Sequence, residues 1–456
     1  MNKKRIHIRY PSFAKARGPG YWSRPYNLWA SRRSFLRSDY SNEWRYTFGE
    51  TDSPDRSASF QSLLEPGKNL PEEFRFVIIG DTGEGDCSQY GLIPLLRYLK
   101  PEFMIIIGDL ANPAGRIDKK GNRDDDDYLA GFFEPYRDFK IPIWSVPGNH
   151  EYYAPGHGKE YYDTFCTRKY AERWARHGLR FVPQPGTYWE LEHPDIPIVI
   201  LGLDTGKAGN LDGSRRSFGK KVPDHKQYKW LEERLTRAER DNKHVIILFH
   251  IPALSGWKLK KELGRKLGLQ KLHRIIASHS CVGHVICGHD HNFQEYSLEK
   301  FNAFMREQYD FTPVDKSSFK YVINGGGGSA LHATDFKGKY KTERLFPDAE
   351  QWKEYSGLGS RMLRSLKVGK TFLAKVVFAL DRSSKGDADS PKFLSFILAS
   401  LKKNTEGGLD FSLEPVWMED IQLLYKNLPE GTEVDVLDEN PSLYINEVKR
   451  CLQKPI

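Results

Sequence analysis

The chain has 456 residues, 39% of them hydrophobic, and a formal net charge of +9 at pH 7. This length exceeds what one hydrophobic core usually organises, so we expect one large domain with extensions, or two domains. No apolar stretch approaches the ~20 residues of a membrane span, and the start of the chain shows no apolar signal segment. The five cysteines are scattered without a CxxC pair, which favours reduced thiols. We therefore expect a soluble, cytoplasmic protein.

The excess positive charge lies in the first 38 residues, which hold ten Lys or Arg and no Asp or Glu. Aromatic residues interleave with these charges, a pattern that suits nucleic acid or a membrane surface. Disordered tails are normally poor in aromatic residues, so docking of this arm on the body of the protein is the favoured interpretation. A transit peptide is disfavoured because Pro11 and Pro25 interrupt an amphipathic helix. Together with the turn-rich stretch that follows, residues 1–70 form a basic, aromatic extension and linker.

Short apolar runs alternate with helical patterns beyond residue 70. Strands are expected at 74–79, 103–107, 141–146, 198–201, 245–249, 285–287 and 321–323. Helices are expected over 92–99, within 223–238 and over 269–276, where apolar residues recur at helical spacing. Residues 154–180 are interpreted as a helical insertion. The alternation of strand and helix predicts βαβ units and an α/β fold.

Two stretches call for a choice between interpretations. The four adjacent aspartates at 124–127 lack the alternate spacing of a calcium loop, so capping of a helix is the better account. Beyond residue 336 the pattern supports only a strand at 373–380 and a strand or helix at 393–401. We therefore expect a catalytic domain over 71–336, followed by a C-terminal extension over 337–456 in which no chemistry is legible.

Many of the predicted strands end in polar residues that can bind a metal ion. The series comprises Gly80-Asp81, Gly108-Asp109, Gly148-Asn149-His150-Glu151, His250 and Gly288-His289-Asp290-His291. Side chains at the ends of strands are where functional groups collect in open α/β sheets. Carboxylate, carboxamide oxygen and neutral imidazole together suit Mn, Fe, Zn or Co rather than a thiolate site or an all-oxygen calcium cage. The pattern therefore indicates a metal site.

The ordered series GD, GD, GNHE, a single His after an apolar strand, and GHxH resembles the calcineurin-like metallophosphoesterase family over about residues 74–335. The resemblance implies a four-layer α/β/β/α sandwich of two mixed β-sheets flanked by helices, with the ligands on loops at one end. It also implies a dinuclear metal centre that holds two divalent or trivalent ions of the Mn, Fe or Zn class.

The resemblance assigns a role to each matching side chain. The implied metal ligands are Asp81, Asp109, Asn149, His250, His289 and His291. Asp109 would bridge the two ions, Asp81 and His291 would belong to the first ion, and the other three would complete the second. His150 would face the substrate without binding metal. Glu151 is interpreted as a support for this loop or for a ligand.

Two positions depart from the family's pattern. Many members carry a His two residues after the first Asp, where this chain has Gly83. The GDxG form is similar to the purple acid phosphatase branch, in which a Tyr three residues after the second Asp replaces that ligand; here the position is Asn112. Asn112 is expected to bind the first ion or to accept a hydrogen bond from His150. We expect no iron–tyrosinate colour and a first ion held by few protein ligands. Glu84 and Asp86 are interpreted as a solvated acidic loop.

The function implied is hydrolysis of a phosphate monoester or diester by a hydroxide activated between two metal ions. His150 would stabilise the transition state or protonate the leaving group. The glycines at 325–328 are interpreted as a tight turn beneath the site. A non-catalytic scaffold or binding protein on the same fold is one alternative, and a nuclease that uses the basic arm is another.

Overall fold

The computed structural model describes residues 7–9, 11, 55–64, 73–83, 85, 87–111, 128–152, 158–206, 225–256, 269–328, 342–346, 394–404, 409–417 and 433–435. Several expected features lie outside these residues. They are Glu84, Asp86, Asn112, the aspartates at 124–127, the strand expected at 373–380 and most of the basic arm.

A five-stranded mixed sheet runs in the order β14-β13-β3-β4-β5. Its parallel strands are β3 (Glu73–Ile79), β4 (Phe103–Ile107) and β5 (Ile143–Val146). Strand β4 is an unbroken apolar run that is buried along its whole length, as is typical of a parallel strand covered on both faces. On the other side of β3 lie the antiparallel strands β13 (Ser395–Lys403) and β14 (Leu409–Trp417). The sheet therefore extends into the C-terminal segment, well past residue 336.

A second, eight-stranded sheet runs in the order β12-β10-β11-β9-β8-β7-β6-β2. Its central strands β7 (Ile198–Gly202), β8 (His244–Phe249), β9 (Val282–Cys287) and β11 (Lys320–Asn324) are parallel. The outer strands are β12 (Arg344–Phe346), β10 (Phe293–Ser297), β6 (Trp189–Glu192) and β2 (Ser57–Ser59). Both sheets deliver the carboxyl ends of their parallel strands to the candidate site.

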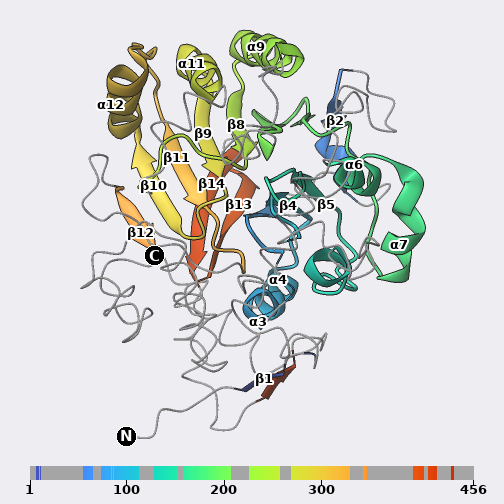
Figure 1. The fold of residues 1–456 in the computed structure, drawn as a ribbon. Helices are drawn as coiled ribbons and strands as arrows, with labels where there is room; N and C mark the ends of the chain where they lie inside the picture. Colours follow the sequence, from blue (N-terminus) through green and yellow to red (C-terminus); the bar gives the residue numbers. More distant parts are fainter. Residues whose placement is uncertain are drawn as a thin grey trace, which may run out of the picture.

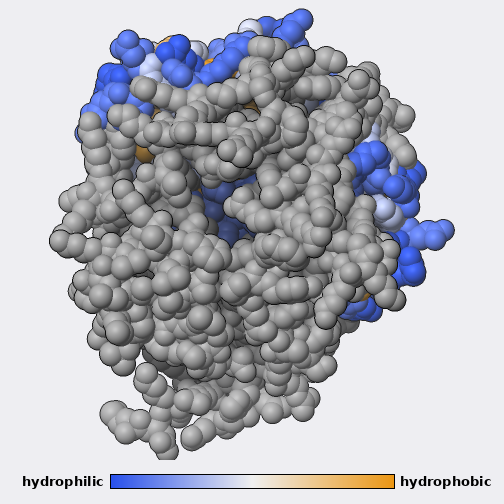
Figure 2. Space-filling view, in the orientation of Figure 1, coloured by the Kyte–Doolittle hydropathy of each residue, from blue (hydrophilic) through white to orange (hydrophobic). Residues whose placement is uncertain are grey.

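Helices cover the outer faces of the two sheets (Figure 1). The first sheet packs against α3 (Cys87–Tyr90), α4 (Ile93–Leu99), the π-helix η3 (Leu129–Phe133), α6 (Lys159–Phe165) and α7 (Ala171–Arg176). The second sheet packs against α9 (His225–Arg240), α11 (Leu269–Ser278) and α12 (Leu298–Tyr309). Where these outer helices reach the surface they are hydrophilic (Figure 2). The expected four-layer α/β/β/α sandwich is thus confirmed.

Successive side chains along each strand point alternately to the two faces of its sheet, and this separates the layers of the fold. In β3, Phe76 and Ile78 point into the core between the two sheets, whereas Val77 and Ile79 point into the core beneath α4. Such a two-residue period is what a strand must show when both its faces are buried. The same period in β8 sends Ile246 between the sheets. One core therefore holds the two sheets face to face.

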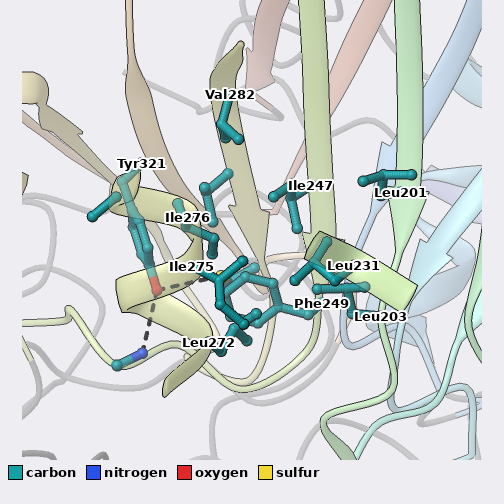
Figure 3. Close-up of a cluster of buried hydrophobic side chains, with 14 of the residues drawn as sticks. Leu201, Leu203, Leu231, Ile247, Phe249, Leu272, Ile275, Ile276, Val282 and Tyr321 are labelled. Atoms are coloured by element: carbon teal, nitrogen blue, oxygen red, sulfur yellow. Dashed lines mark hydrogen bonds between the residues drawn. The ribbon is translucent and has the colours of Figure 1, made fainter. Parts of the chain in front are cut away.

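The core under α9 and α11 contains buried polar groups that are joined by hydrogen bonds (Figure 3). The hydroxyl of Tyr321 is fully buried there, accepts a hydrogen bond from the backbone N–H of Ala253 at 3.2 Å, and lies 3.1 Å from Nε2 of His273. Nδ1 of His273 lies 2.8 Å from the carbonyl of Leu269 and must donate to it, because a carbonyl only accepts. The neutral ring therefore accepts from Tyr321 at Nε2. This chain of bonds anchors the loop that follows His250.

The expected strands and helices that fall on described residues are present, and the segment at 393–401 is a strand. Elements that the sequence analysis did not identify include β6, β10, α12 and β14. Strand β1 (His7–Arg9) pairs in parallel with β15 (Glu433–Asp435), so this part of the basic arm contacts the C-terminal segment. Among the described helices, none is both long and apolar enough to cross a membrane. The described cysteines Cys166, Cys281 and Cys287 are free thiols.

Candidate metal centre

Three of the expected ligands have positive φ angles, a backbone conformation that residues other than glycine rarely adopt. Asp81, Asp109 and His289 have φ angles of 58°, 54° and 71°. Each lies immediately after a glycine that ends a strand, and the chain turns there sharply. The turns are held by backbone bonds, from Asp81 N to the Gly108 carbonyl at 3.1 Å and from Gly83 N to the Asp109 carbonyl at 3.0 Å. Because such conformations cost roughly 1–3 kcal/mol each, they persist only where the surroundings enforce them, as at functional sites.

One group of possible ligands gathers around Asn149. The carboxamide oxygen of Asn149 lies 2.8 Å from Nδ1 of His289 and 3.1 Å from Nε2 of His250. Nε2 of His250 lies 3.2 Å from Oδ2 of Asp109. The ligand atoms of Asp109, His250 and His289 all lie within 4.8 Å of one another. These side chains come from the ends of β4, β5, β8 and β9, so the two sheets build this group together.

A second group shares Asp109 with the first. Its members are Asp81, Asp109 and His291, whose ligand atoms also lie within 4.8 Å of one another. Oδ1 of Asp81 is buried and lies 3.3 Å from Nε2 of His291. Oδ2 of Asp81 accepts from the backbone N–H of His289 at 2.7 Å. Asp81 thus presents one carboxylate oxygen to the group and uses the other to hold the opposite loop.

Glycines allow the two sets of loops to approach so closely. A Cβ on Gly148 would lie 2.2 Å from Oδ1 of Asp109, and a Cβ on Gly108 would lie 2.4 Å from Nδ1 of His250. Gly108 also has a φ of +89°. Any side chain at either position would displace a ligand, because real Cβ contacts are longer than this.

The electrostatics of the site favour a positive charge. Burial alone would lower the pKa of His250, but the carboxylates of Asp109 and Asp81 raise it to about 10. Burial alone would raise the pKa of Asp109, but His250 and His150 hold it well below its usual range. For Asp81 burial prevails over the pull of His250, and its pKa is raised. Two carboxylates this deep in the protein need a compensating cation.

The donor set fits a metal ion. It consists of buried carboxylate, carboxamide and imidazole atoms that converge within coordination reach of one another. His250 is held by its other ring nitrogen, since Nδ1 donates to the Ile107 carbonyl at 2.8 Å and leaves Nε2 for the site. This arrangement, in which a second hydrogen bond sets the ring orientation, is usual for metal-binding histidines. Each of the six expected ligands therefore lies where it can contribute to such a site.

Glu151 lies behind the ligands. Its buried carboxylate accepts hydrogen bonds from the backbone N–H groups of Gly148 at 2.6 Å, Leu110 at 2.9 Å and Asp109 at 3.0 Å, and more weakly from Ala111 at 3.4 Å. It thereby ties the turn after β4 to the turn after β5. Burial, followed by the charge of Asp109, raises the pKa of Glu151 to about 7.

His150 is half-buried, as is His289, whereas the other members of this constellation are buried. Its side chain is 20% exposed and its Nε2 lies 3.8 Å from Oδ2 of Asp109. Its backbone N–H donates to Oδ1 of Asp109 at 3.0 Å, which fixes the start of the side chain. An imidazole so placed can meet a molecule that enters the site from solvent.

The structure explains why no ligand follows Asp81. A Cβ on Gly83 would lie 2.2 Å from the carbonyl carbon of Leu110 and 2.4 Å from the nitrogen of Ala111. On the other side, a Cβ on Gly131 would lie 2.8 Å from the oxygen of Gly83. Three segments of the backbone therefore meet at Gly83 and leave no room for a histidine side chain at this position. Asn112, which the family resemblance places near this ion, lies outside the described residues.

The sequence analysis missed Thr205, which helps to build the site. Its Oγ1 accepts hydrogen bonds from the backbone N–H of His250 at 3.2 Å and of Ile251 at 3.1 Å. The available signal was its place directly after a predicted strand, in Asp204-Thr205. Asp290, which lies between the two expected histidine ligands, instead accepts a hydrogen bond from the hydroxyl of Ser255.

Comparison with known proteins supports the resemblance seen in the sequence. The family model of calcineurin-like phosphoesterases matches residues 74–293. No curated protein matches the chain. The chain is similar to the solved structure of GAP50, the anchor in the inner membrane complex of Plasmodium, at 13% identity over 81% of this chain and 99% of that one, with a TM-score of 0.42.

Two phosphatase structures are also similar to the chain. One is the purple acid phosphatase PPD1 from yellow lupin (Lupinus luteus) seeds, at 16% identity over 78% of this chain and 53% of that one, with a TM-score of 0.41. The other is a dimetal phosphatase from Danio rerio, at 14% identity over 55% of this chain and 86% of that one, with a TM-score of 0.35. The family model confirms the resemblance inferred from the ordered motifs, and it matches residues 74–293 of this chain.

Proposed function

We propose that the protein hydrolyses phosphate esters with two metal ions bound side by side. The observation that carries the proposal is that Asp109 belongs to both groups of possible ligands. Two ions close together need an anionic group between them, and a buried carboxylate common to both groups meets that need. Asp81 and His291 would hold one ion, and Asn149, His250 and His289 would hold the other.

When bound, the ions would activate a water molecule and neutralise the charge that develops on the phosphoryl oxygens. The protein supplies the orientation. The water oxygen forms a bond to phosphorus while the bond from phosphorus to the ester oxygen breaks. His150, partly exposed and held against Asp109, donates a proton to the departing ester oxygen.

The central test replaces Asp109 by Asn. In Asp109→Asn we expect turnover of an aryl phosphate in the presence of Mn²⁺ to fall roughly a thousand-fold, about 4 kcal/mol of transition-state stabilisation. Asp241→Asn is the matched control, because Asp241 lies on the surface after α9 and pairs with Arg240. Unchanged turnover in Asp109→Asn would refute the proposal.

A non-catalytic scaffold or binding protein is the second candidate, and the packing around Gly83 favours it. This packing excludes a histidine ligand for the first ion. Metal analysis of the purified protein separates the two candidates. Binding of at most one ion per chain, without turnover of monoester or diester under any divalent ion, would favour the scaffold.

A further inference from the structure

We propose that Ser395, at the start of β13, is a positioning residue of the candidate metal centre, so that the C-terminal segment completes the site. The inference rests on the proposed metal centre and gives a role to residues in which the sequence shows no chemistry.

Strand pairing brings the start of β13 to the end of β3. The two strands are antiparallel, with Ile397 opposite Ile78 and Phe76 opposite Ala399. As β13 runs against β3, its first residues lie beside the carboxyl end of β3, which leads through Gly80 to Asp81. Ser395 and Phe396 are fully buried there. A residue far along the chain is thereby placed at the base of the first candidate ligand.

The hydroxyl of Ser395 begins a chain of buried hydrogen bonds across the two sheets. It donates to the carboxamide oxygen of Asn324 at 2.9 Å. The carboxamide nitrogen of Asn324 donates in turn to the backbone carbonyl of Ile78 at 3.3 Å. Asn324 is the last residue of β11 in the second sheet and has no exposed surface. Ser395 therefore fixes the orientation of the Asn324 side chain, which joins the two sheets in this chain of hydrogen bonds.

The backbone that follows Asn324 lies against Asp81. A Cβ on Gly325 would lie 2.8 Å from Oδ2 of Asp81, the oxygen that holds the His289 loop. The backbone N–H of Gly327 donates to the Gly80 carbonyl at 2.9 Å. The backbone N–H of Ser395 donates to the Gly326 carbonyl at 3.0 Å. The glycine turn expected beneath the site is thus fastened to Ser395 and to the residue before Asp81.

Loss of the Ser395 hydroxyl leaves the Asn324 oxygen without its donor in a place closed to water. The amide is then free to rotate, and the contact with Ile78 is released. The glycine turn loosens, and with it the wall that holds Asp81. Groups that orient a ligand without touching the metal commonly change metal affinity by roughly 10- to 100-fold.

The test compares Ser395→Ala with Ser400→Ala. Ser400 lies on the same strand opposite Arg75, away from the glycine turn, so it controls for loss of a serine hydroxyl from β13. Calorimetric titration of the metal-free full-length protein with Mn²⁺ is the readout. We expect roughly 10-fold or greater weakening in Ser395→Ala of the binding event that Asp81→Asn removes, and no change in Ser400→Ala.

Hydrogen exchange provides a readout that needs no metal. The amides of Gly325 and Gly327 should exchange faster in Ser395→Ala than in Ser400→Ala. Equal Mn²⁺ affinity in Ser395→Ala and the unmodified protein would overturn this inference alone, whatever the exchange. Failure of the unmodified protein to bind Mn²⁺ would overturn the metal centre and this inference with it.

Discussion

Strands β8 and β9 carry histidines near both of their ends, and the two ends behave differently. Near the beginning of the strands, Nε2 of His244 lies 2.9 Å from Nδ1 of His284, and the ring of Phe411 lies 6.1 Å from each of them. Past the other end, His250 and His289 face Asn149 and the carboxylate of Asp109. The same residue type on the same two strands thus lies beside an aromatic ring at one end and among oxygen atoms at the other.

The pKa values separate the two pairs. Burial, followed by the neighbouring His244 and Lys320, lowers the pKa of His284 to about 3. The pKa of His244 is also lowered, by burial. The pKa of His250 is raised to about 10, because carboxylates outweigh its burial. A pair of histidines is therefore not a metal site in itself; acidic oxygen atoms around it make the difference.

The largest effect is expected from comparing alanine substitutions of the histidines at the two ends of β8. His250→Ala should lower turnover by about a thousand-fold, because it removes a ligand and a hydrogen-bonded link between the sheets. His244→Ala should change turnover less than threefold, since His244 lies at the other end of β8, beside His284 and Phe411. Kinetics with an aryl phosphate and Mn²⁺ measure both. Equal losses in the two variants would show that the comparison is wrong.

Metal removal should lower the stability of the protein only where the candidate metal centre at the carboxyl ends of β8 and β9 is intact. An ion at 100 times its dissociation constant stabilises the folded protein by about 2.7 kcal/mol. A chelator should therefore lower the melting temperature of the unmodified protein and of His244→Ala. The melting temperature of His250→Ala should respond much less. Thermal unfolding with and without the chelator is the measurement.

Glu151→Gln tests the support behind the acidic end. A carboxamide has one acceptor oxygen, so part of the backbone N–H groups of Asp109, Leu110 and Gly148 would lose their acceptor. We expect Mn²⁺ affinity to fall roughly 10- to 100-fold. Glu192→Gln, at the end of β6 and paired with Arg237, is the control. Equal affinities in titrations of both variants would remove Glu151 from the site.

The smallest effect concerns the pH dependence of stability, which we attribute to His284. Because the pKa of His284 falls from 6.5 to about 3 on folding, its contribution to stability is fully present above pH 6.5 and is lost progressively as the pH falls below it. Between pH 6.5 and 5.5 the unmodified protein should lose about 1 kcal/mol more than His284→Phe. Urea unfolding at pH 7.5, 6.5 and 5.5 measures this difference. Parallel pH profiles would contradict it.

Local patterns sufficed for most of the fold and for the candidate ligands. Strands such as β4 are continuous apolar runs bounded by a proline and a glycine, and the metal-binding residue types follow them directly. The side chains that touch one another across the sheets come from such ends. Their meeting could be inferred because the carboxyl ends of parallel strands share one edge.

Other parts carried too weak a local signal. Strand β6 has four residues, and β10 mixes polar and apolar positions without a clear break before α12. The role of Ser395 depends on the pairing of β13 with β3, which no local pattern encodes. Likewise, Gly83 looks like a missing ligand in the sequence, whereas its cause is the meeting of three backbones. Contacts between distant segments decide these features, and they are set by tertiary packing.

The place of β13 has a consequence for how the protein is made. Strand β3 is among the first parts of the sandwich to be synthesised, yet its neighbour on one side is β13, close to the other end of the chain. Until Ser395–Lys403 has left the ribosome, β3 has an open edge that can pair with other chains. Contacts between such distant segments also slow folding. We expect chains that stop before β13 to aggregate, whereas chains complete through β14 should assemble the sheet.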